Sequence, residues 1–254
     1  MPTVGQIFAC LQAKAPVETK LDFDNVGLLV GSPDWDVKKV LLSLDITGPV
    51  TEEAKAIGAQ LVISHHPLFF SLKNIGSLDP QGVKAMNLLT GRVAAICMHT
   101  NLDAADGGVN DALAAALGVE GALPYEPEHI CRIGTLAEPL PLPEFLRRTK
   151  AALRSNGLRY VDGGKPVSRV AVGGGSCGSM LEETAETGCD TFVTADVKYD
   201  TFLRAKELGL NLIDAGHFNT ENVVIPVLRQ WLTEAFPELE IVISGHTQTE
   251  QYYM

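Results

Sequence analysis

The chain contains an internal repeat, in which the second half follows the first in its order of apolar runs, acidic pairs and glycines. Self-similarity at this scale predicts that each copy folds in the same way. We therefore expect two similar halves, at residues 1–123 and 124–254. The matching segments are Val40–Leu42 with Val170–Val172, Glu52-Glu53 with Glu182-Glu183, and Leu61–Ser64 with Thr191–Thr194.

Short runs of β-branched residues alternate with helical stretches along both halves. Such alternation is typical of α/β proteins with mostly parallel sheets flanked by helices. The expected strands are Val40–Asp45, Leu61–Ser64, Val93–Met98, Val170–Gly173, Thr191–Thr194, Leu210–Asp214 and Glu240–Ser244. The expected helices are Val50–Ile57, Pro80–Thr90, Val109–Leu117, Pro143–Ser155, Ser179–Thr187, Tyr199–Leu208 and Thr220–Ala235. We read Gly118–Glu128, which contains two prolines, as a linker between the halves.

Polar clusters follow the expected strands at matching places in the two halves. Ligands of open parallel sheets bind outside the carboxyl ends of the strands. We therefore expect the clusters of both halves to face one cleft, which would hold a metal. The clusters are His65-His66 and His99-Thr-Asn101-Leu-Asp103 in the first half, and Ala195-Asp196 and His217-Phe-Asn219-Thr-Glu221 in the second.

Composition narrows the classes of function. A net charge of −11 disfavours non-specific binding to nucleic acid, because an acidic surface repels phosphates. No apolar run approaches the length of a membrane span, and the first residues do not resemble a secretion signal. The five cysteines are scattered and form no C-x-x-C motif, which favours a reducing compartment. We expect a cytoplasmic protein that does not enter the membrane.

Two adjacent histidines give the sharpest indication of chemistry. Neighbouring residues of a strand point to opposite faces, so His65 and His66 can reach one site only where the strand ends. Pro67 enforces such an ending, because a proline cannot donate to the next strand. Imidazole nitrogens combined with carboxylate oxygens suit zinc, iron, manganese, nickel or cobalt.

The two halves together offer donors for two divalent metal ions per chain. A carboxylate has two oxygens and can bridge a pair of ions, which leaves open positions for water or substrate. Two ions about 3.5–4 Å apart can activate a hydroxide nucleophile and stabilise a developing oxyanion. The predicted metal ligands are His65, His66, Asp103, His217 and Glu221.

His99 is a candidate general acid or base beside the metals. A single histidine after a strand is more often a hydrogen-bonding or surface residue, so this role is open. Asp45, Asp196 and Asp214 also end strands. They could orient the metal ligands through hydrogen bonds, or they could equally be ordinary caps at the ends of strands.

The motifs in this order resemble the dinuclear metal-centre family related to the yeast NGG-interacting factor, whose members are often labelled type-two GTP cyclohydrolase homologues. The resemblance is to the short form of the family, which has no extra domain between the halves. The stretches that carry it are Asp24-Asn-Val-Gly27-Leu-Leu-Val-Gly31, Ser64-His-His-Pro67, His99-Thr-Asn-Leu-Asp103, Gly107-Gly-Val-Asn110 and Asp214-Ala-Gly-His-Phe-Asn-Thr-Glu221.

The resemblance implies two similar α/β domains, a dimetal site in the cleft between them and a toroidal homohexamer. It implies that Asp103 shares one ion with His65 or His66, that Glu221 bridges, and that His217 binds the other ion. Of the two arrangements we favour His66 with Asp103, and His65 with His217. The family label implies hydrolytic opening of the imidazole ring of a guanine nucleotide.

Two classes of function follow from this site. The first is a metal-dependent hydrolase acting on a nucleotide-like small substrate. The alternative is a non-enzymatic protein that stores or delivers metal, or serves as a scaffold for partner proteins.

Two further motifs invite other interpretations. The loop Gly173–Gly178 satisfies G-x-G-x-x-G, and Asp196 follows where a ribose-binding acid would lie, which is the pattern of a dinucleotide-binding half. The repeat favours a different role for this loop, a turn from strand to helix. A further possible role is contact with a phosphate of the substrate. The segment from Gly245 to Glu250, which contains His246, echoes the pattern around His217. We expect a surface or subunit contact there rather than a ligand.

Overall fold

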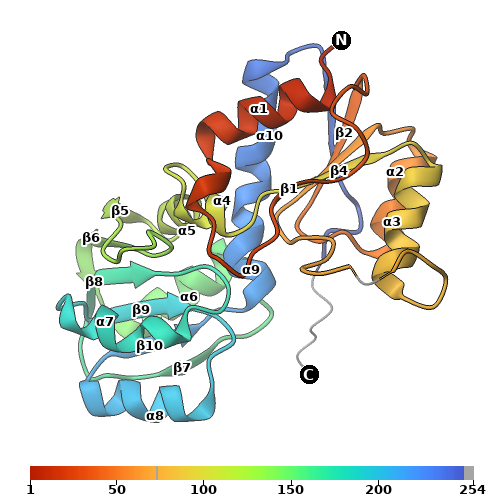
Figure 1. Ribbon diagram of the computed structural model, residues 1–254. Helices are drawn as coiled ribbons and strands as arrows, with labels where there is room; N and C mark the ends of the chain where they lie inside the picture. The colour runs from red at the N-terminus through yellow and green to blue at the C-terminus, as the bar shows by residue number, and fades with distance from the viewer. Residues whose placement is uncertain (73, 249–254) are drawn as a thin grey trace. The chain divides into compact units, whose positions relative to one another are not determined.

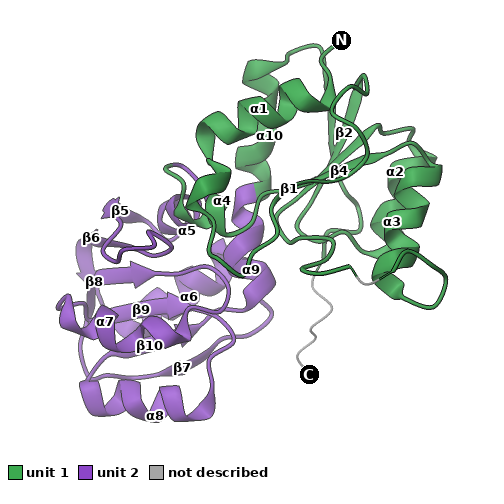
Figure 2. Cartoon of the chain, in the orientation of Figure 1, with its two compact units in different colours: residues 1–106, 225–248 green, residues 107–224, 249–254 purple. Residues whose placement is uncertain are grey.

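The computed structural model describes residues 1–72 and 74–248. The described chain forms two compact units (Figure 2). Unit 1 comprises Met1–Asp106 and Ile225–Gln248, and unit 2 comprises Gly107–Val224. Compared with the expected halves 1–123 and 124–254, residues 107–123 belong to unit 2, and residues 225–248 belong to unit 1.

The sheet of unit 1 has five strands in the order β1-β4-β3-β2-β11. All neighbours are parallel except β1, which runs antiparallel to β4. Three of these strands are completely buried runs, or nearly so, as expected for a parallel sheet covered on both faces. The strands are β1 (Gly27–Val30), β2 (Lys39–Ser43), β3 (Leu61–Ser64), β4 (Ala94–Cys97) and β11 (Glu240–Ile243).

Helices cover both faces of this sheet, with α1 and α10 on one side and α2 and α3 on the other (Figure 1). Side chains fix the helix starts. Thr3 and Gln6 form a capping box at α1, and Asp79 caps α3 ahead of Pro80. The helices are α1 (Val4–Lys14), α2 (Gly48–Ala56), α3 (Pro80–Thr90), α4 (Thr100–Ala104) and α10 (Ile225–Ala235), with a 3₁₀ turn η1 (Val17–Thr19).

The sheet of unit 2 has six strands in the order β5-β6-β8-β9-β10-β7. Only β8, β9 and β10 are parallel to one another, and the other three strands pair antiparallel. The sheet is therefore mixed rather than mostly parallel. The strands are β5 (Val119–Leu123), β6 (Arg132–Leu140), β7 (Arg159–Val161), β8 (Val167–Val172), β9 (Thr191–Thr194) and β10 (Asn211–Asp214).

The helices of unit 2 also lie on both faces of its sheet. Alternate residues of β9 separate the two layers, since Val193 packs with α5 and α6 whereas Phe192 packs with α7 and α8. Across residues 1–72 and 74–248, no helix has the length and apolar character needed to cross a bilayer. The helices are α5 (Val109–Ala116), α6 (Leu142–Ala152), α7 (Leu181–Glu186), α8 (Tyr199–Leu208) and α9 (His217–Glu221), with 3₁₀ turns η2 (Gly178–Met180) and η3 (Asn222–Val224).

The two units share a common core of elements. Unit 1 runs α1-β1-β2-α2-β3-α3-β4-α4, and unit 2 runs α6-β7-β8-α7-β9-α8-β10-α9. In each, three parallel strands are flanked by one antiparallel strand at the same edge. The predicted α/β fold class, with sheets flanked by helices, is confirmed.

Two expectations about local structure are wrong. The segment read as a linker, Gly118–Glu128, contains strand β5, which pairs with β6 at the sheet edge and leaves three of its five residues exposed. Because most residues of β5 face solvent, its sequence does not show the apolar run of a buried strand. The helix expected at Thr220–Ala235 is divided into α9, η3 and α10, and α10 begins at Ile225 so that Pro226 lies in its first turn, where a proline is tolerated.

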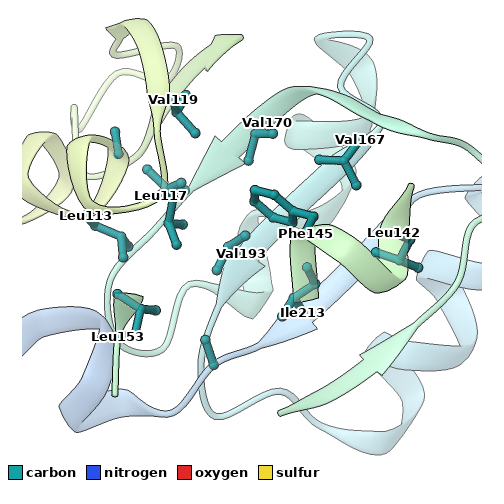
Figure 3. Close-up of a cluster of buried hydrophobic side chains, with 13 residues drawn as sticks. Leu113, Leu117, Val119, Leu142, Phe145, Leu153, Val167, Val170, Val193 and Ile213 are labelled. Carbon is teal, nitrogen blue, oxygen red and sulfur yellow. The ribbon is translucent and has the colours of Figure 1, made fainter. Parts of the chain in front are cut away.

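Phe145 lies at the centre of the apolar layer between α5, α6 and the sheet of unit 2 (Figure 3). Replacing it with alanine removes most of a fully buried aromatic ring, so we expect Phe145→Ala to lower the free energy of unfolding by about 3–5 kcal/mol. Urea unfolding monitored by circular dichroism measures the change. The control is Leu123→Ala, whose side chain is 67% exposed. Equal effects of the two substitutions would contradict this description of the core.

Candidate metal centre

The histidines of unit 1 follow two neighbouring strands. β3 ends at Ser64, immediately before His65 and His66, and β4 ends at Cys97, two residues before His99. These strands are parallel and in register, with Ser64 opposite Cys97, so their carboxyl ends lie side by side. The expectation that the polar clusters follow strand ends is met within unit 1.

Each of His65 and His66 has its Nδ1 atom against an oxygen acceptor. His65 Nδ1 lies 2.9 Å from the carbonyl oxygen of Met98, and His66 Nδ1 lies 2.8 Å from Asp45 Oδ1. A carbonyl oxygen can only accept, so the neutral ring of His65 carries its proton on Nδ1 and its lone pair on Nε2. Orientation of this kind is typical of histidines that bind metals through Nε2.

His99 has the same arrangement, with its Nδ1 atom 2.9 Å from Asp24 Oδ1. The other carboxylate oxygen of Asp24 accepts hydrogen bonds from the backbone and hydroxyl of Thr100. Burial raises the pKa of Asp24, but the hydrogen bonds from His99 and Thr100 outweigh it and lower the pKa to about 2. Asp24 is thus an ionised, buried partner that fixes the ring of His99. Asp24 belongs to a stretch that carries the family resemblance, but no local pattern connects it to His99.

The three rings form one cluster with Asp103 beside it. One nitrogen of each histidine lies within 4.8 Å of the others, and the ring centroids are 4.9–5.5 Å apart. His65 Nε2 lies 3.7 Å from Asp103 Oδ1. The structure thus brings Asp103 close to His65 within unit 1.

In unit 2, His217 and Glu221 lie one turn apart on α9, which directly follows β10. His217 Nδ1 lies 2.7 Å from Asp196 Oδ2, and His217 Nε2 lies 3.1 Å from Glu221 Oε2. Asp196 has φ of 51°, a left-handed conformation that aspartate tolerates better than most residues. Burial lowers the pKa of His217, but the carboxylates of Glu221 and Asp196 outweigh it and raise the pKa to about 9.

The glycine loop after β8 lies directly against this pair. A Cβ on Gly175 would overlap Oε1 of Glu221 and would lie 3.2 Å from His217 Nε2. The backbone of Gly175 has φ of +64° and donates to Thr220 Oγ1 over 3.0 Å, which ties the loop to α9. Only glycine at this position leaves room for the carboxylate of Glu221.

This geometry argues against a dinucleotide site. In a phosphate-binding loop the backbone N–H groups point at the ligand. Here the N–H groups of Gly174 and Gly175 donate to the side chains of Asn110 and Thr220, and that of Cys177 donates to Thr194. The carboxylate that would bind a ribose, that of Asp196, instead accepts from His217.

The donors of both clusters fit divalent metal ions. An imidazole nitrogen and a carboxylate oxygen lie 3.7 Å apart at His65–Asp103 and 3.1 Å apart at His217–Glu221, so a cation between them is favourable. In unit 2, a proton on His217 supplies this positive charge in the metal-free protein. Nitrogen and oxygen donors of this kind suit zinc, iron, manganese, nickel and cobalt.

The remaining polar residues of the motifs have structural partners. Asn101 donates to the carbonyl oxygen of Ala15 at the end of α1, and Asn219 donates to that of Leu153 at the end of α6. Asp214 pairs with Arg159 and accepts from the backbone of Val197.

The C-terminal echo of the His217 pattern makes contacts with α2 and with the residue that follows β2. Gly245 donates its backbone N–H to Glu53 Oε1, and Thr247 Oγ1 accepts from the backbone of Leu44. His246 itself is exposed. Glu250, the acidic residue of the echo, lies outside the described residues.

Comparison with known proteins identifies the family. The family model described as Duf34/NIF3 (NGG1p interacting factor 3) matches residues 2–250. The chain belongs to the Duf34/NIF3 family. A relative from Clostridium perfringens, named "GTP cyclohydrolase 1 type 2 homolog", is 33% identical over 250 residues, which are 95% of this chain and 95% of the relative. The resemblance drawn from the sequence motifs is confirmed.

Solved structures share the fold of this chain. A Bacillus cereus protein related to NIF3 shares the fold with a TM-score of 0.91 at 24% identity, over 100% of this chain and 99% of that chain. Reduced HcgD from Methanocaldococcus jannaschii has a TM-score of 0.84 at 28% identity, over 96% of this chain and 98% of that chain.

The hydrogen-bonded carboxylates around His217 make its titration a direct test of the site geometry. In the metal-free protein we expect the His217 imidazole to titrate near pH 9, because its proton is held by Glu221 and Asp196. In Asp196→Asn the neutral amide stabilises the imidazolium less, so the pKa should fall toward its ordinary value near 6.5. NMR titration of the imidazole resonances measures both values. Titration of wild-type His217 near pH 6.5 would contradict the geometry.

Proposed function

We propose that this NIF3-family protein is a metal-dependent hydrolase that binds two divalent ions and acts on a nucleotide-like small substrate. The observation that supports it most is shared by all four motif histidines. Each has its Nδ1 atom within 2.9 Å of an oxygen acceptor, so Nε2 is the nitrogen that we propose to bind metal or transfer a proton. The proposed metal ligands are His65, His66, Asp103, His217 and Glu221.

The residues around the ligands prepare them for this role. Asp45 and Asp196 accept from His66 and His217, which raises the basicity of the nitrogen that faces the metal. Gly175 leaves space for Glu221. When bound, two divalent ions activate water and neutralise negative charge on the substrate. The ions we propose are zinc, iron, manganese, nickel or cobalt.

His99 is the proposed general acid or base. Its ring is mostly buried beside His65 and His66, and its Nδ1 atom is held by the ionised Asp24. This arrangement leaves Nε2 as the atom that takes a proton from water or gives one to a leaving group. Asp24 stabilises the ring when it becomes positively charged, as a buried carboxylate does for a catalytic histidine.

The names of the relatives suggest which substrate to test first. The Clostridium perfringens relative is named as a homologue of GTP cyclohydrolase 1 type 2. Hydrolytic opening of the imidazole ring of a guanine nucleotide is therefore the first reaction to examine. We further propose that the chain forms a homohexamer, as the family resemblance implies. We also propose that it is located in the cytoplasm, since its five free cysteines suit a reducing compartment.

Metal content tests the ligand set. We expect about two ions per chain in protein purified without chelator, and a clear loss in Glu221→Ala and in His66→Ala, because each substitution removes a ligand. Mass spectrometry of the metals measures the content. Glu120→Ala, which removes an exposed carboxylate on β5, is the control and should keep both ions. One ion or none in the wild type, or equal content in all variants, would contradict the proposal.

Gly175→Ala tests the space that the loop leaves for Glu221. The added methyl group must displace the carboxylate, so we expect zinc affinity to fall by about 10–100-fold. Competition with a fluorescent chelator measures it. Gly164→Ala is the matched control, because Gly164 also has a left-handed φ, +82°, but faces open space. Equal losses in the two variants would assign the effect to backbone strain instead.

Turnover separates the enzyme from the alternative. The proposal expects the metal-loaded wild type to hydrolyse GTP or another member of a panel of nucleotides and phosphoesters. His66→Ala and His99→Ala should both lose this activity, whereas His99→Ala should keep its metals. Inertness of the wild type toward the whole panel would favour a metal-storage or scaffold role.

A further inference from the structure

Two exposed aromatic rings lie beside the histidine cluster of unit 1. The side chains of Phe23 and Phe70 are 64% and 53% exposed. Their ring centroids are 6.2 Å apart with an interplanar angle of 45°. Exposed phenylalanines cost hydration free energy, so a close pair of them at the edge of a polar site marks a surface that a ligand covers.

The phenylalanine rings are followed by the rings of the histidine cluster, each close to the next. Phe70 lies 5.9 Å from His99, centroid to centroid, and His99 lies 5.1 Å from His65 and 5.5 Å from His66. A planar ligand resting on the phenylalanines would thus have its edge within reach of the nitrogens that we assign to metal binding and proton transfer.

Hydrogen bonds tie together the two loops that carry the rings. Asn25 donates its side-chain amide to the carbonyl oxygen of Phe69 over 2.8 Å, which joins the loop of Phe23 to the loop of Phe70. Asp24, next to Phe23, is bound to His99 and Thr100. The two loops that carry the rings are therefore fixed next to each other, which lowers the entropic cost of binding.

We propose that Phe23 and Phe70 form a stacking subsite for the planar heterocyclic ring of the substrate, and that they select aromatic over non-aromatic compounds. This inference rests on the proposed function, since it describes the substrate of the same site. Stacking of a heterocyclic ring on an aromatic side chain contributes about 1–3 kcal/mol to binding. This contribution does not depend on which hydrogen-bonding groups the ring carries at its edge. The subsite thus selects a class of compound, the heteroaromatic ring, rather than one base.

Binding to the metal-loaded protein tests the subsite, with guanosine monophosphate and ribose 5-phosphate as probes. These two differ by the base, so their affinity ratio isolates the ring. Calorimetry should show guanosine monophosphate binding about 5- to 150-fold more tightly, the equivalent of the stacking range. Phe70→Leu and Phe23→Leu should reduce this ratio while leaving ribose 5-phosphate affinity unchanged. Phe70→Tyr, which keeps the ring, should preserve it.

Controls separate this inference from the proposed function and from a subunit contact. Leu78→Ala removes an apolar side chain that is 97% exposed and should leave the ratio unchanged. Two bound ions with no preference for guanosine monophosphate, or a preference that survives both leucine variants, would overturn the subsite alone. Failure to bind either probe would overturn it as well. Loss of the native oligomer in the leucine variants, with the ratio intact, would assign the rings to a subunit interface. Absence of metal in the wild type would instead refute the proposed function.

Discussion

The hydrogen bond at Nδ1 of each site histidine is the constraint on which the chemistry of this protein depends. An imidazole has two nitrogens, and a ring free to rotate presents either of them. Here an oxygen fixes the ring in every case, through the carbonyl of Met98 or the carboxylates of Asp45, Asp24 and Asp196. Nε2 is then the nitrogen that we propose to bind the metal, and the hydrogen bond at Nδ1 restricts how the ring can turn. Buried or half-buried carboxylates near these rings supply the negative charge that a cation requires.

The repeated fold explains how two copies of one unit come to carry different donors. The strand ends of both copies provide equivalent positions, but the side chains at these positions differ. His65-His66 after β3 has its counterpart in Ala195-Asp196 after β9, and Asp196 supports His217 instead of acting as a ligand itself. His99 and His217 open equivalent helices, α4 and α9, after β4 and β10. The two helices keep the same kinds of side chain, with a histidine at the start, an asparagine two residues later and an acidic residue, Asp103 or Glu221, one turn on.

The sequence was sufficient for the elements that carry strong local patterns. Buried strands such as β3 and β9 are short continuous apolar runs, and helices such as α3 and α8 have the expected bounds. The motif residues at the ends of those strands could therefore be placed correctly within each unit. The sequence did not reveal strands β5 and β6, because neither is a continuous buried apolar run: three of the five residues of β5 and four of the nine residues of β6 are exposed.

The parts of the site that escaped prediction are those that tertiary contacts create. Asp24 reaches His99 and Thr100 across more than seventy residues of sequence, and no spacing rule connects them. Gly175 appeared to belong to a nucleotide-binding loop, because the sequence cannot show that its N–H group is bound to Thr220 or that Glu221 occupies the adjoining space. Phe23 and Phe70 carried no pattern at all. Local patterns predict elements, whereas the fold decides which side chains become neighbours.

The most direct test of this account is a crystal structure of the zinc-loaded protein with anomalous scattering data collected at the zinc edge. The account predicts two anomalous peaks per chain, each about 2.0–2.1 Å from the Nε2 atom of a site histidine, with the Nδ1 hydrogen bonds intact. Zinc bound through Nδ1, or strong peaks only at places remote from these histidines, would contradict it.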